Sequence, residues 1–104
     1  MKIIFHREAR LEAAEAARQY EAQRTGRGAS FTYAVGDKLE DVAERPGVAR
    51  PEPDAPPGID ARRVRVQRFP YALVLVIQSP ERAVLIAVAH DKREPGYWHH
   101  RVDK

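Results

Sequence analysis

The sequence predicts an α+β fold of order β-α-α-β-β-β, in which a helical hairpin packs on a largely antiparallel four-stranded sheet. Three observations lead to this fold class. Apolar residues recur with helical spacing in two segments of the first half of the chain. Two apolar runs separated by a short turn lie near the end, and a proline-rich loop divides the halves. With 104 residues in all, we expect residues 1–104 to form one domain.

The chain begins with a short apolar segment, Lys2 to Phe5, that is typical of an edge or second-tier strand. A helix opens at His6-Arg7-Glu8, because small apolar residues recur on one helical face while the charged residues lie mostly off it. That face consists of Ala9, Ala13, Ala16, Ala17 and Tyr20. The stretch Thr25-Gly26-Arg27-Gly28 ends this helix, since glycine readily adopts the left-handed conformation of a helix stop.

A second helix is predicted from about Ala29 to Ala43. Its apolar face is Phe31, Val35, Leu39 and Val42. The stretch Arg45-Pro46-Gly47 stops it, and two helices joined by a short glycine-containing turn form an antiparallel hairpin. The proline-rich segment from Val48 to Asp60 is expected to be an extended surface loop.

The last third predicts a three-stranded meander. In the first strand, Val64 and Val66 alternate with arginines, so one face of this strand is expected to be exposed to solvent. The two strands that follow, Ala72–Ile77 and Ala83–Ala89, are apolar on both faces and are joined by a turn at residues 79–82. We therefore expect these two strands to be central, with the helices covering one face of the sheet.

Charge is distributed unevenly along the chain. Residues 1–61 hold nine Lys and Arg against eleven Asp and Glu, a net charge of −2. Residues 62–104 hold nine against four, a net charge of +5. The basic half predicts an acidic partner, either nucleic acid or an acidic peptide that masks it.

The composition also bears on the cellular compartment. The chain contains no cysteine, which excludes disulfides and thiolate metal sites and fits a reducing compartment. Charged residues follow the first few apolar residues of the chain, which is unlike the apolar region of a secretory signal. The longest apolar run, Tyr71 to Ile77, is too short to span a bilayer. We expect a soluble cytoplasmic protein that does not contact the membrane.

Several motifs, in this order and spacing, resemble the RelE/ParE toxin superfamily, and in particular its plasmid-stabilisation members. The most specific are a Phe-Pro-Tyr corner and a His-x-x-Arg-x-Pro-Gly-Tyr-Trp tail. The full set is Glu8-Ala9, Glu15-Ala16, Tyr20-Glu21, Phe31, Pro46, Arg62-Arg63, Arg68-Phe69-Pro70-Tyr71, Ala87-Val88-Ala89-His90, Arg93, Pro95-Gly96-Tyr97-Trp98 and Arg101. The resemblance covers nearly the whole chain.

The resemblance implies a toxin of a type II toxin–antitoxin module. Such toxins arrest growth when released from a small, partly disordered antitoxin, with which they form a hetero-oligomer. RelE-like members enter the ribosome and cleave mRNA, whereas ParE-like members poison DNA gyrase. The resemblance implies no cofactor and no metal.

The two mechanisms need different residues. Cleavage of RNA at a 2′-hydroxyl needs a base, an acid and positive charge near the phosphate. The candidates for this chemistry, if the chain is a nuclease, are Arg65, His90, Arg93 and Tyr97. Arg63, Arg68 and Arg101 are candidates for binding the target or nucleic acid. RelE-like nucleases also carry an arginine near the start of the strand that begins here at Pro70-Tyr71-Ala72, where this chain has no basic residue. The ParE-like interpretation is therefore favoured.

Structural roles for the same residues stay open. His90 is as well suited to bonding the backbone of the tail as to catalysis, and Tyr97 has no favoured role. Trp98 is expected to pack, and the adjacent His99 and His100 are expected to be surface residues, since no third metal ligand is evident. The strand arginines could form a solvated face or pair with helix carboxylates. A non-toxic binding module whose basic sheet captures an acidic peptide or nucleic acid is the alternative from another functional class.

Overall fold

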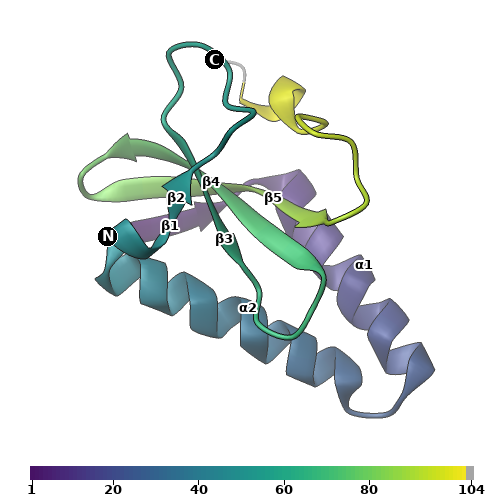
Figure 1. Ribbon diagram of the computed structural model, residues 1–104. Helices are drawn as coiled ribbons and strands as arrows, with labels where there is room; N and C mark the ends of the chain where they lie inside the picture. Colours follow the sequence, from purple (N-terminus) through teal and green to yellow (C-terminus); the bar gives the residue numbers. More distant parts are fainter. Residues whose placement is uncertain (103–104) are drawn as a thin grey trace.

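The computed structural model describes residues 1–102 (Figure 1). The helices and strands are β1 (Lys2–Phe5), α1 (Arg7–Gln23), α2 (Arg27–Glu44), η1 (Pro46–Val48), β2 (Arg50–Pro51), β3 (Ala61–Arg65), β4 (Tyr71–Ser79), β5 (Arg82–His90) and η2 (His99–Arg101). We call residues Asp91–Val102, which follow β5, the C-terminal tail. The α+β fold class is confirmed, and so is the order of the predicted elements.

The sheet has five strands in the order β1-β5-β4-β3-β2. β1 runs parallel to β5, and the other neighbours are antiparallel. The predicted central position of β4 and β5 is therefore confirmed. The predicted count of four strands is wrong by one, because Arg50 and Pro51 pair with β3 inside the segment expected to be loop. A two-residue strand has no periodicity to detect, and proline is tolerated on such an edge.

The helical hairpin covers one face of the sheet (Figure 1). Alanines on α1 and larger residues on α2 pack against the inward side chains of β4 and β5, such as Leu73 and Leu85. At the far end of this core, Phe31 is 0% exposed and its ring lies 5.0–5.3 Å from the rings of Tyr20, Phe69 and Tyr71. The Phe-Pro-Tyr corner therefore closes this end of the core.

The opposite face of the sheet is covered by the C-terminal tail, drawn in yellow in Figure 1. Trp98 is 2% exposed and packs with Ala61, Val74, Ile86 and Ala87. A bulge in β5 places Ile86 opposite no residue of β4, so both Ile86 and Ala87 face this second cluster. The expectation that Trp98 packs is confirmed.

Candidate functional site

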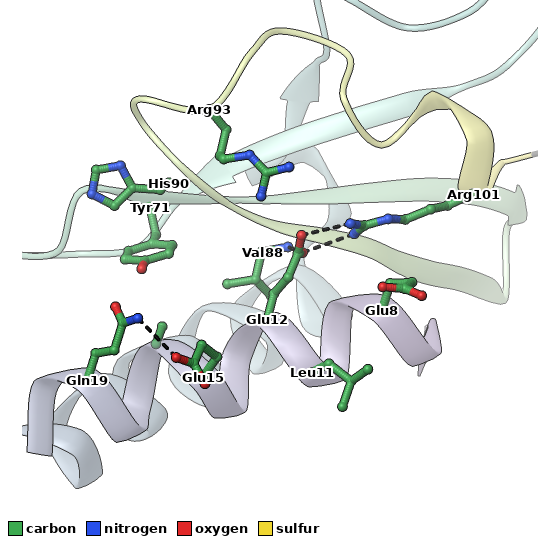
Figure 2. A pocket seen from close by; sticks show the side chains of 11 residues that line it. Glu8, Leu11, Glu12, Glu15, Gln19, Tyr71, Val88, His90, Arg93 and Arg101 are labelled. Atoms are coloured by element: carbon green, nitrogen blue, oxygen red, sulfur yellow. Dashed lines mark hydrogen bonds and ion pairs between the residues drawn. The ribbon is translucent and has the colours of Figure 1, made fainter.

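A cavity of about 640 Å³ lies between α1, the end of β5 and the C-terminal tail. We call it the α1–β5 groove (Figure 2). One wall carries the carboxylates of α1, and the other carries basic groups from β5 and the tail. The charged residues are Glu8, Glu12, Glu15, His90, Arg93 and Arg101. The three glutamates share one side of α1 because they are spaced by four and three residues.

Glu12 connects the structural elements that line this groove. Its carboxylate accepts two hydrogen bonds from the Arg101 guanidinium, at 3.0 and 2.8 Å, and one from the Tyr97 hydroxyl at 2.8 Å. It also accepts a hydrogen bond from the backbone N–H of Val88, at 2.9 Å. The two charged side chains are well shielded, with 6% of Arg101 and 17% of Glu12 exposed. One carboxylate therefore joins α1, β5 and the C-terminal tail.

The electrostatics of this cluster follow from burial and from Glu12. Burial, followed by the hydrogen bond to Glu12, raises the pKa of Tyr97 well above its ordinary value. Burial acts to lower the pKa of Arg101, but the bonds to Glu12 outweigh it and the net shift is upward. Near neutral pH, Tyr97 is a neutral donor and Arg101 a cation, so in this arrangement neither group exchanges a proton readily.

His90 and Arg93 line the same groove without joining the Glu12 cluster. The His90 Nδ1 accepts a hydrogen bond from the backbone N–H of Lys92 at 3.0 Å, which is the backbone contact considered for it from the sequence. The Arg93 guanidinium lies over the ring of Tyr97, 3.7 Å from its centroid. Within residues 1–102, no carboxylate forms a salt bridge with Arg93.

The arginines of β3 are held in ion pairs. Arg65 donates two hydrogen bonds to Asp91, at 2.9 and 3.1 Å, and these bonds hold the pKa of Asp91 below its ordinary value. Arg63 bonds Glu52, whose side chain is only 1% exposed, at 2.9 Å. Both carboxylates come from loops and not from the helices. The two arginines thus fasten the proline-rich loop and the start of the tail to β3.

The candidate residues do not form one constellation. Arg68 lies apart from the groove, at the corner before β4, where its φ is 71° and its neighbour across a hollow is Lys38. His90, Arg93 and Arg101 share the groove, while Arg65 bonds Asp91 and lines the same hollow as Arg68. Arg63 and Tyr97 meet His90 and Arg93 in a smaller cavity on the other side of the tail. The residue that sequence reasoning missed is Glu12, which it placed only among the charged residues off the apolar helix face.

Two further classes of feature are missing from the part of the chain that the structure describes. Residues 1–102 contain no group of three His, Cys, Asp or Glu side chains positioned to hold a metal ion. None of the helices in this range combines the length and the hydrophobicity needed to cross a bilayer.

Comparisons with known proteins agree with this geometry. The family profile described as ParE toxin of type II toxin–antitoxin system, parDE, matches residues 3–95. A solved chain of the chromosomal ParDE TA system from P. aeruginosa is similar in fold, with a TM-score of 0.61 and 16% sequence identity. The alignment covers 86% of this chain and 95% of that chain. No curated protein matches the chain in sequence.

Proposed function

Because the chain belongs to the ParE toxin family of type II toxin–antitoxin systems, we propose that it arrests growth by poisoning DNA gyrase when it is released from its antitoxin. It acts in the cytoplasm, where both gyrase and the ribosome reside, and its module is of the kind that stabilises plasmids. In the resting state it forms a hetero-oligomer with the antitoxin.

The observation that carries the choice of gyrase over mRNA is the engagement of Tyr97 and Arg101 by Glu12. A ribonuclease needs groups free to take and give protons beside the scissile phosphate. Here the Tyr97 hydroxyl already donates to a carboxylate, and its raised pKa makes it a poor acid–base group. Arg65, another nuclease candidate, is neutralised by Asp91. An action by binding makes no such demand.

The exposed arginines are the proposed contacts with the target. Arg68 projects from the corner before β4, and Arg93 follows β5 at the rim of the groove. Within residues 1–102, neither forms a salt bridge. A free arginine offers a target carboxylate or phosphate a planar set of donors. Arg63 and Arg65 would bind the target through the guanidinium N–H groups that their ion pairs do not use. Arg101 could bind it only after its bonds to Glu12 are broken.

The test is induced expression in cells, followed after arrest by analysis of plasmid topology, DNA breaks and mRNA ends. We expect arrest, broken or relaxed plasmid DNA and intact mRNA, with rescue by the small protein encoded beside the toxin gene. Arg93→Ala should weaken the arrest, whereas Arg18→Ala, on the exposed side of α1, should not.

Each other outcome assigns a different function. Codon-positioned mRNA cuts that disappear in Arg93→Ala or Tyr97→Phe would replace the proposal with a RelE-like ribosome-dependent endonuclease. Unchanged growth of a host that accumulates the folded protein would rule out a toxin and favour a non-toxic binding module.

A further inference from the structure

We propose that the C-terminal tail is a latch, held closed by Glu12, whose opening exposes Trp98 and uncovers the unpaired edge of β5. The contacts that close the latch all lie within this chain, so the latch is independent of the proposed function. The latch lies where two neighbouring strands, β1 and β5, differ in length.

The outer edge of β5 is only partly covered by a strand. β1 pairs with Arg82 to Leu85 and ends there, because Phe5 is its last residue. β5 continues to His90, and within residues 1–102 no strand pairs with this side of it beyond Leu85. An unpaired edge of apolar strand is a ready template for another chain.

Side chains occupy this edge where a strand would otherwise bond. Glu12 accepts from the Val88 N–H, and the Arg101 guanidinium donates to the carbonyl oxygen of Ile86 at 3.1 Å. Arg101 and Glu12 also bond each other twice. The pair therefore caps a backbone donor and a backbone acceptor at once, as one unit that spans α1, β5 and the tail.

The last part of the tail is fastened to the rest of the protein at few points. Its backbone bonds within residues 94–102 are local, such as those from Tyr97 to Glu94 and from Arg101 to Trp98. Within residues 1–102, the hydrogen bonds that leave this segment reach Glu12, the Ile86 carbonyl and the Asp54 carbonyl. The remaining attachments are the packing of Trp98, with Tyr97 and Val102 beside it, against the second cluster, and the contact of the Arg93 guanidinium with the Tyr97 ring.

Loss of Glu12 should open the latch instead of merely weakening it. Without the carboxylate, Arg101 would remain in a site where it is 6% exposed, with its charge unpaired and its Nε already lacking a partner. Breaking a buried ion pair by removing one partner is strongly unfavourable because it strands the other charge. Swinging the tail outward returns this charge to water, and Trp98 leaves with it.

The test compares Glu12→Ala with wild type through the single tryptophan, Trp98, which reports on the tail alone. We expect the folded variant to show red-shifted Trp98 emission and strong quenching by acrylamide. Trypsin cleavage after Arg101, which follows the population of the open form, should become at least about tenfold faster. Far-UV circular dichroism should retain the helical signal.

The matched control is Glu15→Ala, one turn along α1, whose carboxylate bonds only Arg18 and Gln19 within residues 1–102. It should leave both readouts at the wild-type level. If Glu12→Ala fails to fold, Glu12→Gln provides the same comparison with side-chain volume preserved. Shielded Trp98 in the folded variant, or cleavage after Arg62 in β3 that accelerates as much as cleavage after Arg101, would overturn the latch.

Discussion

The close approach of α1 and α2 at Gly28 yields a prediction with an internal reference. A Cβ added at Gly28 would lie 2.5 Å from the backbone oxygen of Ala17 and 3.0 Å from the Cβ of Glu21. A backbone atom cannot move aside as a flexible side chain can, so Gly28→Ala should force the helices apart. Gly36, in the same helix, has nothing within 4 Å of its added Cβ.

The two substitutions are expected to change the free energy of unfolding in opposite directions. Overpacking a close contact destabilises a protein by about 1–3 kcal/mol. The higher helix propensity of alanine offsets at most about 1 kcal/mol of this loss. Gly28→Ala should therefore lower the free energy of unfolding by up to about 2 kcal/mol after this offset. Gly36→Ala gains helix propensity with no contact to disturb, and should raise it by about 0.5–1 kcal/mol.

Urea unfolding followed by far-UV circular dichroism measures both variants against wild type. The two changes are chemically identical and occur in one helix, so the difference between them isolates the interhelical contact. If Gly28→Ala proved as stable as Gly36→Ala, the close packing of α1 on α2 described above would be refuted.

Three further predictions concern single contacts. Phe31→Ala should lower the free energy of unfolding by about 3–5 kcal/mol, because a fully buried ring is lost, and a loss below about 1 kcal/mol in urea unfolding would contradict this. Tyr97→Phe should lower it by about 1.5 kcal/mol through the lost bond to Glu12, and an unchanged midpoint would argue that this bond is absent in solution. Arg65 lowers the pKa of Asp91 in the folded protein. The pair therefore stabilises the fold at any pH above the ordinary pKa of an aspartate, and this stabilisation is lost as the pH falls through the lower pKa of the folded state. The difference in stability between wild type and Asp91→Asn should thus shrink in strong acid, and a constant difference would rule out the pair.

Local patterns were sufficient to predict most of the fold. Helical spacing identified α1 and α2, and the apolar runs identified β4 and β5 as central, because burial on both faces leaves no alternation. The packing role of Trp98 could also be predicted from its place after Pro-Gly. These features depend on residues near one another in the sequence or on composition alone.

Features that depend on distant residues could not be predicted. Glu12 meets Val88, Tyr97 and Arg101 across 76, 85 and 89 residues of sequence, and on a helix it is indistinguishable from its neighbouring glutamates. The pairing of Arg65 with Asp91 likewise depends on register and on the path of the tail. The sequence left open whether the strand arginines form a solvated face or pair with helix carboxylates; Arg63 and Arg65 pair instead with loop carboxylates.

The most direct test of the proposed function is a reaction of the purified chain with DNA gyrase, plasmid and ATP. Linear, broken plasmid should accumulate as the chain is added, and prior addition of the antitoxin should prevent this. Ribosomes translating a defined mRNA, given the same amount of chain, should leave the message intact. Unaffected gyrase together with a cut message would show that the target is mRNA and not gyrase.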